Sequence, residues 1–205
     1  MTPARRTLLG VALFVPLAAV LLTMFACLPV PVGDAATAKL DDKLTGAWKL
    51  VPSDPADKDT VTVAVLRPLD EHTWFLQYIN SEKKDGADKI STAHYRAWLT
   101  PIGGVTFITC EALDDSAFLT PGKDSDRYYF VAKVEAKDDT VTLKPLKDDF
   151  APLKDVKDRA KAEEAIKANV DNQDMYGDAM VFKKLTKDEV TLVEELLKKG
   201  NIGVH

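Results

Sequence analysis

Apolar residues fill the first part of the chain, and most of the remainder alternates between apolar and polar positions. Residues 7–33 contain no charged side chain, and Arg5 and Arg6 precede this run. A basic start followed by a long apolar stretch is typical of a segment that targets a chain to a membrane. We therefore predict a signal or membrane-anchor segment over residues 1–33, with its hydrophobic part from Thr7 to about Val32, and an exported domain behind it.

The pattern beyond this segment predicts a β-rich domain. Residues 34–43 are small or polar and indicate a short tether, and a single domain is expected over residues 44–205. Short β-branched and aromatic runs are separated by turn residues, and the polar stretch Asn80 to Lys89 is interpreted as one of the turns. Because the strands are consecutive and mostly hairpin-linked, we expect an antiparallel meander or a barrel, possibly incomplete. The expected strands are Gly46–Val51, Thr60–Leu66, His72–Ile79, Ile90–Leu99, Val105–Cys110, Tyr128–Glu135 and Thr140–Leu146.

Helices are expected only near the C-terminus. Asp155–Val170 is rich in Lys, Ala and Glu and has a sparse apolar stripe, which predicts a mostly exposed helix. Met180–Leu185 can supply one more strand. Thr186 and Glu189 then form a capping box at the start of a second helix that ends near Lys199. The fold class is therefore β-rich α+β with two helices near the C-terminus.

The end of the apolar run leaves three fates open. The Ala26-Cys27 pair resembles the end of the bacterial lipobox, where a lipidated cysteine becomes the new N-terminus, so Cys27 is the candidate lipid attachment site. Roughly 20 apolar residues also suffice for an uncleaved transmembrane helix, with the basic end in the cytoplasm. Cleavage after Ala36-Thr37-Ala38 would instead release the domain. All three fates place the domain outside the cytoplasm, and the first two hold it in the cell envelope.

Charge and residue types indicate little chemistry. The formal net charge is −5, which argues against binding to nucleic acid. His72, His94 and His205 do not stand at metal-ligand spacings, and Cys110 is expected to be a buried, inert thiol in a strand. The acidic loop at residues 114–126 lacks the ligand pattern of a calcium loop. We therefore predict no catalytic residue, no metal site and no cofactor.

Gly46-Ala47-Trp48, at the opening of the first expected strand, resembles the Gly-x-Trp motif that begins the barrel of lipocalins and related calycins. The resemblance implies many antiparallel strands followed by a terminal helix, with Trp48 closing the lower end of the barrel. It also implies an interior that can take a small hydrophobic ligand. The layout of the whole chain is similar to that of small exported bacterial lipoproteins of uncharacterised function.

Three functional hypotheses follow from these patterns. The first is a non-enzymatic, membrane-tethered extracytoplasmic domain that binds a ligand or maintains the envelope. The second is a structural or interaction partner in an envelope protein assembly, with the helix Thr186–Lys199 or a free sheet edge as its contact surface. The third is an enzyme, for which a cleft that joins His94, Arg96 and acidic loop residues would be the sign.

Overall fold

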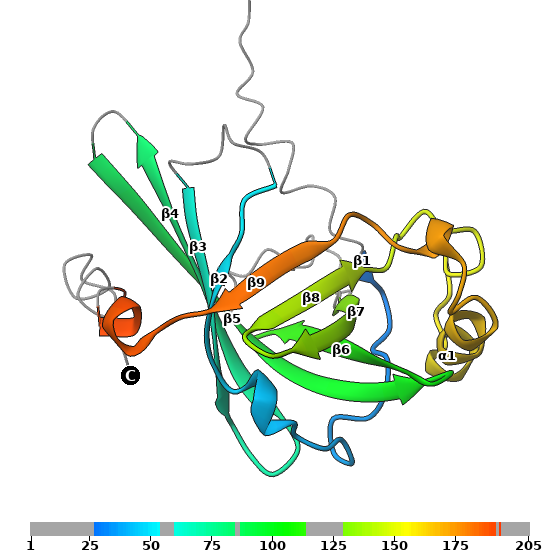
Figure 1. Ribbon diagram of the computed structural model, residues 1–205. Helices are drawn as coiled ribbons and strands as arrows, with labels where there is room; N and C mark the ends of the chain where they lie inside the picture. The colour runs from blue at the N-terminus through cyan, green and yellow to red at the C-terminus, as the bar shows by residue number, and fades with distance from the viewer. Residues whose placement is uncertain (1–26, 54–59, 85–86, 114–128, 192, 194–205) are drawn as a thin grey trace, which may run out of the picture.

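The chain folds into a closed antiparallel β-barrel. The computed structural model describes residues 27–53, 60–84, 87–113, 129–191 and 193. Strands β2 to β9 pair in chain order and β2 also pairs with β9, which completes an eight-stranded barrel, while β1 pairs with the start of β7 (Figure 1). The strands are β1 (Cys27–Leu28), β2 (Gly46–Leu50), β3 (Thr60–Pro68), β4 (Trp74–Lys84), β5 (Ala87–Ile102), β6 (Val105–Ala112), β7 (Tyr129–Lys137), β8 (Thr140–Pro145) and β9 (Met180–Lys184).

Alternation along the strands sorts side chains between the inside and the outside of the barrel. In β5, Ala93, Tyr95 and Ala97 belong to the interior cluster of buried residues, whereas Trp98 is buried on the outer face. Alternate residues of β5 therefore lie on opposite faces of the barrel wall. Because bulky aromatic and aliphatic side chains from all eight strands meet inside, the barrel has one continuous apolar interior.

Closure decides the fold class that the sequence left open. The expected meander or barrel is a complete barrel, so the incomplete version is wrong, because Trp48 to Leu50 of β2 pair with Phe182 to Lys184 of β9. That pairing leaves no free sheet edge between β2 and β9. Closure protects strand edges from pairing with another chain.

The β4–β5 hairpin is much longer than the sequence predicts. Residues 80–84 pair with residues 87–91, so the polar stretch from Asn80 to Lys89 is mostly paired strand and the expected turn is too long. Asp85 and Gly86, between the paired arms, lie outside the described residues. Apart from Ile90, which packs against the cluster around Val63 and Ile79, most residues of these arms are polar and give no alternating signal. Strand pairing here satisfies the backbone groups.

Two layers cover the outside of the barrel. Residues 28–32 and the connection between β8 and β9 pack on the outer face of β5 to β7, around Phe107, Val131 and Ile166. Leu185 and Val193 pack on the outer face of β3 and β4, against Val63 and Ile79. The β8–β9 connection contains helix α1 (Arg159–Ala168), and the short 3-10 helices are η3 (Asp42–Leu44) and η5 (Gln173–Met175).

Both C-terminal helices are present where the structure describes them, with bounds set by their caps. The Asp158 side chain accepts a hydrogen bond from the Lys161 N–H and caps α1, which begins at Arg159, four residues later than predicted. Residues 187–191 form the start of the second helix. Its predicted capping box is confirmed, because the Thr186 N–H donates to Glu189 Oε2 at 2.9 Å and the Glu189 N–H donates to Thr186 Oγ1 at 3.4 Å.

The two ends of the barrel differ. At the turn end, η3 leads into β2 and short turns join β3 to β4, β5 to β6 and β7 to β8. At the opposite end, which we call the loop end, the β2–β3, β6–β7 and β8–β9 connections join the strands, and the long β4–β5 hairpin also extends there. Strand β1 lies at the loop end, beside the first two residues of β7 and just beyond the tip of β8 (Figure 1).

Candidate functional site

The barrel interior contains an apolar cavity of about 110 Å³. Every barrel strand contributes to its wall, so the cavity exists only because the sheet closes. The described lining residues include no Asp, Glu, Lys, Arg or His. They are Leu44, Trp48, Ala64, Leu66, Leu76, Tyr78, Tyr95, Ile108, Cys110, Phe130, Val134, Val141, Leu143, Met180 and Phe182.

Trp48 forms part of the cavity wall at the turn end. Its indole N–H donates a 2.8 Å hydrogen bond to the carbonyl of Leu44 in η3, and both side chains are buried. The Lys184 ammonium lies 5.3 Å from the centre of the Trp48 ring, a cation–π geometry. Gly46 has φ +129, a backbone conformation that favours glycine. The hydrogen bond from Trp48 to Leu44 thus holds η3 against β2 at the turn end.

The polar atoms of the wall are neutral. Burial raises the pKa of Tyr78, and a hydrogen bond with Thr62 opposes part of that rise. Cys110 is buried, as expected, and this burial raises the pKa of its thiol to about 12, so the thiol stays protonated near neutral pH. Since an unpaired charge is costly to bury in such surroundings, the wall favours an uncharged occupant.

The two described histidines, His72 and His94, do not line the cavity. His72 Nδ1 lies 2.8 Å from the Ala38 carbonyl oxygen at the turn end, and the His94 ring stacks on Phe75 at 5.4 Å on the outer face of the sheet. Neither belongs to a group of three or more metal-binding side chains within the described residues. His205 and the acidic loop at residues 114–126 lie outside the described residues.

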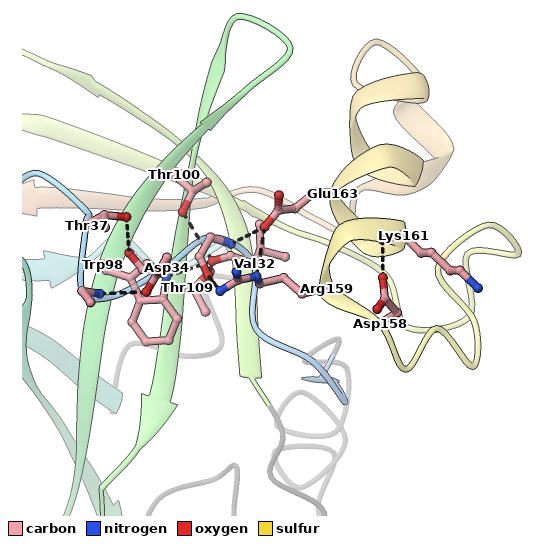
Figure 2. A network of polar contacts seen from close by, with 12 residues as sticks. Val32, Asp34, Thr37, Trp98, Thr100, Thr109, Asp158, Arg159, Lys161 and Glu163 are labelled. Atoms are coloured by element: carbon pink, nitrogen blue, oxygen red, sulfur yellow. Dashed lines mark hydrogen bonds and ion pairs between the residues drawn. The ribbon is translucent and has the colours of Figure 1, made fainter.

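A second polar arrangement, which no sequence pattern signals, fixes residues 28–38 to the outside of the barrel. The Val32 carbonyl accepts hydrogen bonds from Trp98 Nε1 at 2.8 Å, Thr109 Oγ1 at 2.8 Å and Thr100 Oγ1 at 3.3 Å. Figure 2 shows these side chains converging on one backbone position. The donors come from β5 and β6, far along the chain, so only the folded structure brings them together.

The same segment is also linked to α1. The Gly33 N–H donates to Glu163 Oε1 at 3.0 Å, and Arg159 Nη1 donates to the Gly33 carbonyl at 3.4 Å (Figure 2). Leu28 and Val32 are 2% and 0% exposed. Residues 34–43, expected as a tether, include the buried Ala38 and therefore lie against the barrel along part of their length.

The candidate lipid attachment residue lies in β1, where its backbone pairs opposite Phe130. The charge-free residues 7–26 precede it and lie outside the described part of the chain. Among the helices that the structure describes, none has the length and apolar character needed to cross a bilayer. Lipid attachment at Cys27 therefore stays a prediction.

Comparison with known proteins finds no family model, no curated protein and no solved structure that matches this chain. The cavity and the placement of residues 27–38 are the structural features that bear on function.

Proposed function

We propose that this chain is a membrane-held extracytoplasmic binding protein whose barrel accepts a small, uncharged apolar molecule. The observation that supports the proposal is the cavity of about 110 Å³ inside the closed barrel. Protein interiors are normally packed with few voids larger than a water molecule. An unfilled apolar space of this size inside an otherwise well-packed barrel is what a binding site requires.

The chemistry of the wall defines the ligand class. Aliphatic and aromatic carbon forms almost all of it, and the Cys110 thiol stays protonated because burial raises its pKa to about 12. The wall offers no charged group to activate a substrate, which favours binding over catalysis. An engineered apolar cavity of about 150 Å³ stays dry and binds benzene. We therefore expect a compact ligand of about benzene size, or the apolar end of a larger molecule.

The residues around the cavity leave some room for adjustment. Met180 and Leu143 lie in neighbouring strands on the cavity wall, and methionine is flexible enough to fill irregular gaps. Movement of such side chains would admit a somewhat larger ligand without opening the barrel. The membrane-held part of the proposal is supported by the charge-free run after Arg5 and Arg6.

A charged and an uncharged probe of similar shape test the proposal. Thermal unfolding of the full chain in lipid nanodiscs should be measured with benzene and with benzoate. Benzene at a hundred times its dissociation constant should stabilise the fold by about 2.7 kcal/mol, and benzoate should not. If neither benzene nor larger neutral probes such as indole and short alkanols raise the unfolding temperature, the proposed function is wrong.

A further inference from the structure

The inner face of β3 and β4 changes from apolar to polar just beyond the cavity. Alternate residues of a strand share a face, and Leu76 and Tyr78 of β4 pack against the interior cluster. The next residue of β4 on that face is Asn80, and Thr62 lies opposite it on β3. Ala64 and Tyr78 form the preceding pair and both line the cavity. Thr62 and Asn80, which we call the polar pair, therefore adjoin the cavity wall toward the loop end.

Hydrogen bonds connect the polar pair to the cavity wall. Thr62 is 5% exposed, and its hydroxyl donates a 3.0 Å hydrogen bond to Asn80 Oδ1. The side chains of Thr62 and Tyr78 are also hydrogen-bonded to each other. Asn80 is half-buried, and its amide nitrogen carries two N–H donors for which the described residues supply no acceptor. These donors are available to an oxygen atom of a ligand.

The polar pair occupies only one side of the interior. On β2, β6, β7 and β9, residues at or next to the loop-end terminus of each strand pack against the interior cluster and are apolar; they are Leu50, Ala112, Phe130 and Met180. One step beyond the polar pair, Glu82 of β4 lies opposite Lys89 of β5, so the charged positions that follow on this face are opposite in sign. This arrangement suits a ligand that carries a neutral polar group on an apolar body.

We infer that the ligand is amphipathic, with its apolar body in the cavity and a neutral oxygen group, such as a hydroxyl or a carbonyl, at Asn80. The inference deepens the proposed function and rests on it, since the apolar body needs the cavity. The cavity of about 110 Å³ takes a body of about benzene size. Asn80 follows Tyr78 by two residues, which span roughly 6.6 Å of strand, so a short arm on such a body reaches the amide.

The position of the oxygen along the ligand decides its effect on affinity. An oxygen held inside the cavity loses its hydrogen bonds to water and meets a wall that is almost entirely carbon, which is unfavourable. The same oxygen placed at Asn80 accepts a hydrogen bond from Nδ2 instead. Small-molecule sites commonly combine an apolar wall with a few polar groups that fix the orientation of the ligand.

A series of phenyl alcohols with the hydroxyl at the end of the arm tests this position. Benzyl alcohol, phenylethanol and phenylpropanol should be compared with toluene, ethylbenzene and propylbenzene, by titration of the tryptophan fluorescence of the full chain in lipid nanodiscs. Empty nanodiscs give the free concentration of each ligand. The ratio of the dissociation constant of the alcohol to that of its hydrocarbon should fall about tenfold from the shortest arm to the longest, because only the longest arm gains the hydrogen bond.

Substitutions on opposite faces of β4 supply the matched comparison. Asn80→Leu removes the amide and leaves the hydrogen bond between Thr62 and Tyr78 in place. This variant should bind phenylpropanol about tenfold more weakly and propylbenzene at least as tightly as the unsubstituted chain does. Ser81→Ala, at the next residue on the outer face of β4, is the control and should leave both dissociation constants unchanged.

The outcomes separate this inference from the proposed function. A constant ratio across the three arm lengths would overturn the inference without any substitution, and so would an Asn80→Leu variant that keeps its affinity for phenylpropanol or loses affinity for both ligands equally. In each of these cases, hydrocarbon binding by the unsubstituted chain would leave the proposed function standing. Binding of neither series would reject both.

Discussion

The indole N–H of Trp98 donates a 2.8 Å hydrogen bond to the carbonyl of Val32, which lies 66 residues earlier in the chain. Both residues are buried, and Thr109 donates to the same oxygen at 2.8 Å. A carbonyl oxygen has two lone pairs, so these two donors use its capacity and the Thr100 contact at 3.3 Å is secondary. The segment next to the predicted membrane run is thereby part of the barrel wall.

A side chain at Gly33 should disrupt this contact. Gly33 has φ +76, and a Cβ there would lie 1.7 Å from Thr100 Oγ1. Gly33→Ala should therefore lower the free energy of unfolding by more than the roughly 1 kcal/mol expected from backbone strain alone. Gly104→Ala is the matched control, because Gly104 has φ +85 and a Cβ added there would meet nothing within 4 Å. Urea unfolding of both variants gives the comparison, and equal losses would contradict the close contact at Gly33.

Removal of residues 28–38 should strongly destabilise the barrel. Burial of Leu28 and Val32 contributes about 1.5–3 kcal/mol each, and the loss of the Val32 carbonyl leaves two buried donors unpaired. The free energy of unfolding of a chain that begins at Leu28 should therefore be larger, by at least about 3 kcal/mol, than that of a chain that begins at Lys39. Chemical denaturation followed by tryptophan fluorescence measures the difference. Equal stability would show that this segment is dispensable.

A larger side chain at Ala64 should fill the cavity. Ala64 lines the cavity wall and is 8% exposed, so Ala64→Leu should eliminate the rise in unfolding temperature produced by benzene. Overpacking should cost about 1–3 kcal/mol in the absence of ligand, which a separate scan of the unliganded variant measures. Ala168→Leu, on the exposed face of α1, is the control and should keep the full response to benzene. A response that survives in Ala64→Leu would place the ligand elsewhere.

The Cys110 thiol should be protected in the folded protein. Burial raises its pKa from the ordinary value of 9.0 to about 12, so the unfolded chain loses this proton at lower pH than the folded chain. This contribution to stability is therefore fully present below about pH 9 and is lost as pH rises toward 12. At pH 8, a disulfide reagent should modify Cys110 only as fast as the protein unfolds. The exposed thiol of Leu113→Cys should react at once and serves as the control.

Much of the barrel could be predicted because its information is local. Alternation in residues 93–99 assigns Tyr95 and Trp98 to opposite faces without knowledge of any partner strand. The capping box between Thr186 and Glu189 spans four residues and was equally predictable. The polar arms of the β4–β5 hairpin were not, because Ile90 is their one apolar side chain packed against a buried cluster and most of their residues carry no apolar pattern.

Some features of the candidate site could likewise be predicted from the sequence, and others could not. The apolar and polar faces of the strands, the buried setting of Cys110 and the charge-free run at the N-terminus follow from the order of residues alone. Closure of the barrel, the cavity inside it and the hydrogen bonds from Trp98 and Thr109 to Val32 are known only from the folded chain. Alternation and capping act between neighbours in the chain, whereas closure, cavity volume and these hydrogen bonds depend on how distant segments pack together.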